Sequence, residues 1–238
     1  MGILGILRRD RGTTSTAREA LAEARSGASG SSSGALSRLV ETFRDIGLEG
    51  KLTFSSASEV ARRAQRGRAR TAPQRAVRRI VRSHRRGVTA TGFLTGLGGV
   101  FTLPVLLPTN IVAFYVQATR MVGAIAVVRG YDLEDEEVRV RVLAALLGEE
   151  SADLLKNLGL GPVAGAVSRQ VESRLPGGTE TAVAKALGSR IISRFGLRSV
   201  RLFGKAIPGL AGVLGALADR SQLKRITAAA HTTFPPQG

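Results

Sequence analysis

The chain has 238 residues, enough for one domain with a sizeable core, and it contains no cysteine and only two histidines. The lack of cysteine excludes disulfides, thiolate catalysis and Cys-ligated zinc or iron–sulfur sites, and His84 and His231 cannot by themselves form a metal cluster. The net charge is +17, and residues 1–90, with 19 basic and 7 acidic residues, supply +12 of it. We therefore expect a polyanionic partner, and neither a cofactor nor a metal.

Residues 1–35 have the composition of a flexible N-terminal segment. The opening "MGILGILRRDR" lacks the long apolar core and the cleavage site of a signal peptide, so we expect no export signal. The stretch "GASGSSSG" at residues 27–34 is typical of a linker. We expect a folded domain over residues 36–234 and a short tail over 235–238.

The pattern of the folded part favours helices throughout. Residues 36–47 and 58–66 are expected to form short helices, and Pro73 suits the first turn of a helix that runs to about Arg86. The alternating "EVRVRV" at residues 137–142 runs straight into "LAALL" after an acidic start, so we favour a helix there too. Arg139 and Arg141 would then lie about 200° apart on that helix. The predicted fold class is all-α.

A stretch of 33 residues without charge, from Gly87 to Thr119, exceeds the roughly 20 residues that a membrane span needs. Its glycines, together with Pro104 and Pro108, are expected to divide it into a short piece and a second helix over residues 109–129. On that helix Asn110, Gln117 and Arg120 share an arc of about 80°, and such a polar stripe favours a protein interior over lipid. The prediction is a compact hairpin, and an integral membrane hairpin is the alternative.

Three stretches carry a resemblance to a known family. They are "GFLTGLGGVFTLPVLLPTN" from Gly92, "QATRMVGAIAVVRGYD" from Gln117, and the closing "RFGLRSVRLFGKAIPGLAGVLGALADRSQLKRITAAAHTTF". In order and spacing, from about Val60 to Phe234, they resemble the EcsC family. The matching positions are Gly92, Phe93, Gly96, Gly98, Gly99, Thr102, Leu103, Pro104, Pro108, Asn110, Gln117, Arg120, Met121, Gly130, Tyr131, Asp132, Lys156, Gly159, Phe195, Gly196, Gly204, Lys205, Pro208, Asp219 and Phe234. The resemblance implies an all-helical bacterial domain, a family name tied to an operon that encodes an ABC exporter, and no established chemistry.

Two basic segments are candidates for binding an anionic surface. The segment Arg62 to Arg86 holds eleven arginines and no acid, and its helix carries Arg78, Arg79, Arg82, Arg85 and Arg86. A second helix, expected over residues 182–206, places five basic residues within an arc of about 80° opposite an apolar face. These five are Arg190, Arg194, Arg198, Arg201 and Lys205. Both segments fit an anionic membrane surface, and the plainer interpretation of each is an ordinary solvated helix face.

A buried polar cluster or ligand site is predicted from Asn110, Gln117, Arg120 and Asp219. We expect an apolar helix from Pro208 to end at Asp219, where the helix dipole disfavours an acid, so Asp219 needs a partner. Arg120 is the natural partner because it is an isolated charge in apolar sequence. The predicted result is a buried Arg120–Asp219 ion pair.

No Ser-His-Asp order or carboxylate pair stands out, so we expect no enzymatic activity. The function we expect is that of a membrane-associated helical protein that docks on anionic lipid or binds a hydrophobic or lipid ligand. An accessory role in envelope transport or secretion, a protein partner and a cytoplasmic location at the inner face of the membrane belong to that expectation. The first alternative is a nucleic-acid-binding module that uses Arg62–Arg86, and the second is the integral membrane hairpin. The oligomeric state stays open.

Overall fold

The structure is a computed structural model that describes residues 40–50, 55–69, 71–97, 99–161, 178–195 and 210–237. Within these ranges only the backbone is described for residues 68, 88–97, 99–110, 192, 194–195 and 210–216. The regular elements of this part are all helices, which confirms the all-α prediction. They are η1 (Asp45–Glu49), α4 (Ala57–Ala64), η2 (Gly67–Ala69), α5 (Pro73–Leu97), α6 (Gly99–Val128), α7 (Glu136–Ala145), η3 (Gly148–Glu150), α8 (Ser151–Asn157), α9 (Thr179–Phe195) and α11 (Leu210–Thr233).

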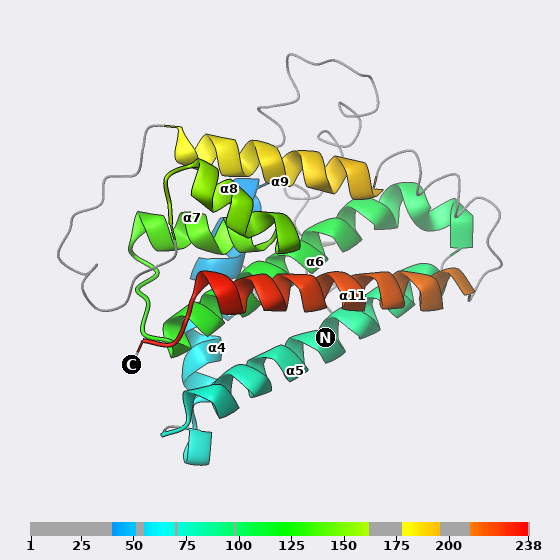
Figure 1. The fold of residues 1–238 in the computed structure, drawn as a ribbon. Coiled ribbons are helices and arrows are strands. Elements are labelled where there is room, and N and C mark those ends of the chain that lie inside the picture. The colour runs from blue at the N-terminus through cyan, green and yellow to red at the C-terminus, as the bar shows by residue number, and fades with distance from the viewer. Residues whose placement is uncertain are drawn as a thin grey trace.

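Helix α6 is the centre of the fold. The long helices α5 and α11 pack against it and against each other, and α4 crosses the α5–α6 pair near one end (Figure 1). Helix α7 covers another side of α6 and carries α9 on its far side. The C-terminal end of α5 and the N-terminal ends of α6 and α11 lie together at the end of the molecule opposite α4 (Figure 1).

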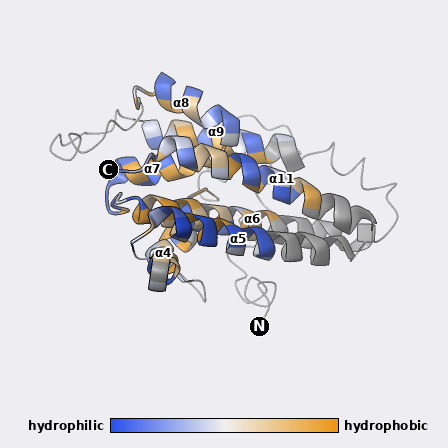
Figure 2. Cartoon of the chain, turned by 60° about the horizontal axis from the view of Figure 1, so that its bottom comes forward, coloured by the Kyte–Doolittle hydropathy of each residue, from blue (hydrophilic) through white to orange (hydrophobic). Residues whose placement is uncertain are grey.

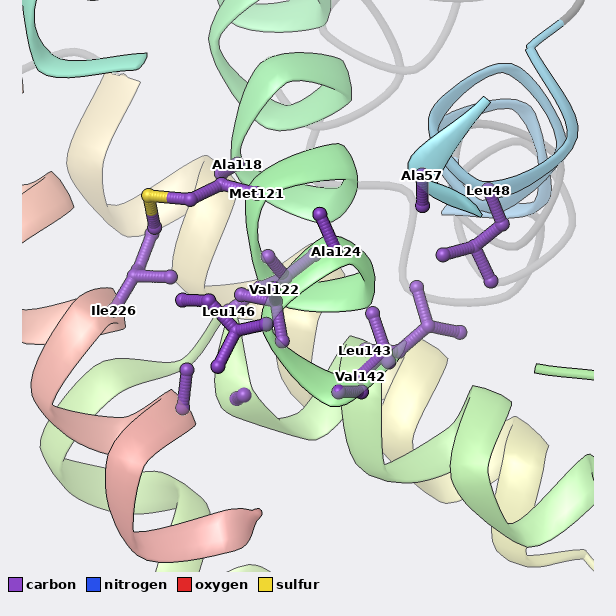
Figure 3. Packing of buried hydrophobic residues seen from close by; sticks show 14 of the residues in the cluster. Leu48, Ala57, Ala118, Met121, Val122, Ala124, Val142, Leu143, Leu146 and Ile226 are labelled. Atoms are coloured by element: carbon purple, nitrogen blue, oxygen red, sulfur yellow. The ribbon is translucent and has the colours of Figure 1, made fainter. Parts of the chain in front are cut away.

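The core is built around the second half of α6. From Ile111 to Ala126 every residue is buried except Arg120, which is half-buried. In Figure 3, Met121 points toward Ile226 of α11, while Leu48 and Ala57 lie on the opposite side of α6. The ring of Tyr115 stacks on Phe43 at a centroid distance of 5.2 Å. Burial of each large apolar side chain contributes about 1.5–3 kcal/mol, so this packing around α6 dominates the stability.

Local signals set several of the helix ends. Ser56 caps α4 by accepting a hydrogen bond from the Glu59 backbone N–H at 3.1 Å, and Asp135 caps α7 by accepting from Glu137 N–H at 2.8 Å. These caps satisfy backbone donors that the first turn leaves free. The alternating stretch that starts at Glu137 is therefore helical, as expected. Arg141 is buried and pairs with Glu137 at 2.6 Å, whereas the half-buried Arg139 pairs with Glu134 at 3.1 Å.

The apolar block is divided at a different place from the one predicted. Helix α5 continues past Arg86 to Leu97, and α6 begins at Gly99, so both prolines lie inside α6. Each interior proline removes one backbone hydrogen bond, but the two are four residues apart and the rest of the ladder can continue around them. The two helices are therefore separated between Leu97 and Gly99, before the prolines.

Helix α11 also corrects a prediction. It runs without interruption from Leu210 to Thr233, so Asp219 lies inside the helix and does not end it. After Gly215 the sequence "ALADRSQLKRITAAAHTT" has neither glycine nor proline, so nothing in it stops a helix. The dipole argument for a partner of Asp219 therefore no longer applies, although the side chain is buried, with 5% of its surface exposed.

The end of α6 clamps the end of α11. Gly130, at φ 90°, closes α6 with hydrogen bonds from Tyr131 N–H to Ala126 O and from its own N–H to Val127 O. The buried Arg129 donates to the carbonyls of His231 and Phe234. The Tyr131 hydroxyl donates to Pro235 O at 3.0 Å, and its ring meets Phe234 edge to face. The segments "RGYD" and "HTTF" thus join the end of α6 to the end of α11.

Candidate functional site

An open pocket of about 380 Å³ lies where α4, α5 and α6 meet. Helix α4 contributes Arg63, α5 contributes Arg79, Ser83 and His84, and α6 contributes Gln117 and Arg120, together with Ser55 and apolar side chains. The described residues that line it include three arginines and no acid. This volume is near the lower end of the range of about 300–1,000 Å³ for small-molecule sites. Two of the four residues predicted to form a polar cluster, Gln117 and Arg120, lie in its wall.

His84 is buried in the wall of this pocket, with 7% of its surface exposed. Its Nδ1 lies 2.9 Å from the Ile80 carbonyl oxygen, and because a carbonyl only accepts, Nδ1 carries the proton. Burial first, and then the charge of Arg120, lower the pKa of His84 from 6.5 to about 4, although the bond to Ile80 acts in the opposite direction. His84 is therefore neutral at physiological pH, and its Nε2 carries a lone pair that can accept a hydrogen bond.

Gln117 is buried as well, with 3% of its surface exposed. Its amide oxygen lies against the backbone of Gly87 in α5, and a Cβ at position 87 would stand 2.8 Å from that oxygen. Only glycine allows this approach, so the close α5–α6 packing fixes the amide. Its nitrogen, Nε2, is buried and has no hydrogen-bond partner in the described part of the chain.

Arginines supply the charge of the pocket. Burial lowers the pKa of Arg120, the half-buried cation on α6. Arg79 donates to the carbonyl oxygens of Ala64 at 3.0 Å and Arg66 at 3.2 Å, so it holds the C-terminal end of α4, where the helix dipole is negative. Arg63 pairs with Glu59 on the surface of α4. Arg63 is therefore balanced by a carboxylate, whereas the described partners of Arg79 are neutral carbonyls.

The predicted Arg120–Asp219 pair stays a prediction. Both residues are at least partly removed from solvent, on the packed helices α6 and α11, and both make contacts within the protein. The side chain of Asn110, the fourth member of the predicted cluster, lies outside the described residues.

The outer face of α5 carries a line of exposed arginines, called the α5 stripe here: Arg75, Arg78, Arg82 and Arg86. At about 100° per residue they share an arc of about 80°. The opposite face of the helix is buried through Ala76, Val77, Ile80 and His84. Of the other predicted surface residues on this helix, Arg79 is exposed and lines the pocket, and Arg85 is half-buried. Figure 2 shows the hydrophilic outer side of α5.

The second predicted basic segment is described only in part. Helix α9 confirms a helix up to Phe195, and Arg190 on it is half-buried and paired with Glu150 of η3. That pairing balances the charge of Arg190. The side chain of Arg194 and all of Arg198, Arg201 and Lys205 lie outside the described residues.

Two further features bear on the kind of site. Within the described ranges no group of three or more His, Asp or Glu side chains is arranged to hold a metal ion. One described helix segment, Ile111–Val128, is long and apolar enough to cross a membrane, and 89% of its residues are buried inside the protein. It has the burial expected of the core helix of a folded domain.

His84 and Ser83 were not predicted as site residues, yet a signal for His84 was present. It follows Ala76 and Ile80 at intervals of four residues, which places it on the buried face of α5. Ser83 gave no comparable signal, since it belongs to the exposed side of the helix and its hydroxyl donates to Ile80 O at 2.8 Å.

The chain is thus an all-helical domain with a polar, arginine-lined pocket beside a basic helix face. A comparison with protein-family models matches the EcsC protein family over residues 71–235, and the chain belongs to that family. Neither the comparison with curated proteins nor that with solved structures found a match.

Proposed function

We propose that this protein is a non-enzymatic, peripheral membrane protein that docks on an anionic bilayer through the α5 stripe. The observation that carries the proposal is the line of four exposed arginines on α5, whose opposite face is buried in the core. Between Arg62 and Arg86 the sequence contains no acid that would balance them. Each basic residue near an anionic lipid surface contributes about 1 kcal/mol of binding.

The sequence beyond the stripe favours lipid over nucleic acid. Directly after Arg86 the chain has no charged residue until Arg120, and α5 continues into this stretch before the chain reverses into α6. A basic stripe followed by an uncharged, apolar helical hairpin suits the boundary between headgroups and acyl chains. A nucleic-acid backbone offers phosphates but no apolar layer. The proposed location is the cytoplasmic face of the membrane, where anionic lipid is exposed.

The test is co-sedimentation with vesicles of phosphatidylcholine alone and of phosphatidylcholine with phosphatidylglycerol. We expect binding to the anionic vesicles only, and release by salt at about 0.5 M, because screening then shortens the range of the charges to a few ångströms. Equal binding to neutral vesicles would contradict the proposal. Binding that resists salt and requires detergent for extraction would favour an integral hairpin, and a shift of duplex DNA without vesicle binding would favour the nucleic-acid module.

Two variants with the same net charge separate a specific face from bulk charge. The stripe variant replaces Arg75, Arg78, Arg82 and Arg86 by glutamine. The control variant replaces four exposed residues on α8, α9 and α11 by glutamine: Lys156, Lys185, Arg220 and Lys224. Each set of four neutral replacements lowers the net charge from +17 to +13. Only the stripe variant should lose binding to anionic vesicles.

A further inference from the structure

The α4–α5–α6 pocket holds a set of polar groups that the docking face does not use. Three kinds of group meet there: cations at Arg79 and Arg120, the buried Gln117 amide N–H, and the neutral His84 ring with an unprotonated Nε2. Such a set recognises a ligand by charge and by hydrogen bonding together. A pocket that only completed the core would be filled by apolar side chains, and a buried donor without a partner is uncommon in native proteins.

Gln117 is the clearest sign of a ligand. A buried amide nitrogen without a partner costs free energy, typically about 1–3 kcal/mol, unless something outside the protein accepts its hydrogen bond. Its amide oxygen is pressed against Gly87, so the group cannot turn freely to find another acceptor. The nitrogen is itself covered, but it belongs to a side chain that lines the pocket, so a bound acceptor would meet it after a small shift of the amide toward the pocket.

The remaining groups limit the chemistry of the ligand. The positive charge of Arg79 and Arg120 favours an anionic ligand, and the Gln117 amide N–H favours an acceptor oxygen. His84 adds a different requirement: its Nε2 can only accept, so it favours a ligand that also carries an O–H donor. A carboxylate or a sulfate offers acceptors alone at neutral pH. A phosphate monoester has a second pKa of about 6, so its singly protonated form, which offers charge, several acceptors and one P–OH, is within reach near neutral pH.

We propose that this pocket binds a phosphate monoester, with Arg79 and Arg120 facing its charge, Gln117 Nε2 donating to a phosphoryl oxygen and His84 Nε2 accepting from the P–OH. The proposal does not depend on membrane docking. The ligand can be soluble, or it can be the headgroup of a lipid that ends in a phosphate monoester. The pocket shares Arg79 and Ser83 with the solvent side of α5, so it opens beside the α5 stripe.

The first arm of the test uses inorganic phosphate as the probe and measures its dissociation constant by calorimetry at neutral pH, with sulfate at equal ionic strength as the comparison. We expect phosphate to bind more tightly than sulfate. Gln117→Leu removes the unpartnered donor with little change in volume and should weaken phosphate binding about tenfold. The stripe variant should bind phosphate as the wild type does. His84→Leu gives a second, independent variant if Gln117→Leu fails to fold.

The second arm distinguishes the source of the phosphate. Wild-type protein and Gln117→Leu are compared on vesicles that contain phosphatidic acid, a phosphate monoester, and on vesicles of equal surface charge made with phosphatidylglycerol, a diester. A preference for phosphatidic acid that Gln117→Leu abolishes assigns the site to a lipid headgroup. Phosphate binding without that preference assigns it to a soluble ester.

Two results would overturn the proposal. One is the absence of both phosphate binding above the sulfate level and a preference for phosphatidic acid. The other is phosphate binding that Gln117→Leu and His84→Leu both leave unchanged. Loss of vesicle binding in the stripe variant has no bearing on these outcomes, so the docking proposal and the pocket proposal can fail separately.

Discussion

Protonation of His84 should destabilise the fold, and the effect can be isolated because the chain has only two histidines. The pKa of His84 is about 4 in the folded protein against 6.5 in the unfolded chain, chiefly because the ring is buried, with Arg120 and Arg79 in the same pocket wall. At pH values between these two pKa values, His84 is protonated in the unfolded chain and neutral in the folded protein. Stability that is present above about pH 6.5 is therefore lost progressively as the pH falls toward 4.

The magnitude follows from the two pKa values. Between about pH 7.5 and about pH 5, His84 alone should lower the free energy of unfolding by about 2 kcal/mol. The assay is urea denaturation at several pH values in this range, followed by circular dichroism, for the wild type and for His84→Leu. The two proteins differ only at position 84, so the contributions of all other groups cancel in the comparison. We expect the variant to lose about 2 kcal/mol less than the wild type over this range.

His231 is expected to contribute to the pH dependence as well. Its pKa is also lowered, by burial first and then by Arg129, whose guanidinium donates to His231 Nδ1. His231→Gln should therefore reduce the pH dependence in the same direction, independently of His84. If His84→Leu shows the full pH dependence of the wild type, His84 is not held neutral by burial and the description of the pocket wall is wrong.

Three further predictions concern stability. Arg129→Ala should lower the free energy of unfolding by about 2–3 kcal/mol, because it leaves carbonyls at the end of α11 without their charged donor. Tyr131→Phe should lower it by about 1 kcal/mol. Unchanged urea midpoints in both variants would refute the view that these hydrogen bonds hold the ends of α6 and α11 together. Arg141 is buried and bonds to Glu137 and to Gly161 O, so Arg141→Ala should destabilise the fold by about 3 kcal/mol. Arg190 pairs with the exposed Glu150, so Arg190→Ala should cost about 1 kcal/mol or less. If Arg120 and Asp219 form a pair, each alanine variant should lower the unfolding midpoint strongly and the double variant should fall well short of the sum; additive effects would refute the pair.

Helix identity was readable from the sequence, but helix ends in the apolar block were not. Propensity penalises proline inside a helix by about 3 kcal/mol, which argued for breaks at Pro104 and Pro108. Packing of α6 against α5, α11, α4 and α7 outweighs that local cost in the structure. The same applies to Asp219, where a boundary was inferred from one charge and α11 continues through it.

The residues of the pocket, too, could be predicted from the sequence only in part. Gln117 and Arg120 were predicted from a shared helical arc, which depends only on spacing along one helix. Their meeting with Arg79, Ser83 and His84 depends on how α4 and α5 pack against α6, and no pattern within one helix contains that information. Arg129 was missed because its partners are backbone carbonyls about 100 residues away in α11.

The most direct test of the central claim compares the two variants of equal net charge on the same anionic vesicles at low salt. With about 1 kcal/mol for each arginine at the surface, the stripe variant should show a partition coefficient up to about a thousandfold below that of the wild type. The control variant, with its neutral replacements at Lys156, Lys185, Arg220 and Lys224, should stay within a few-fold of the wild type. Equal losses in the two variants would mean that bulk charge, not the face of α5, holds the protein on the membrane, and would contradict the proposed function.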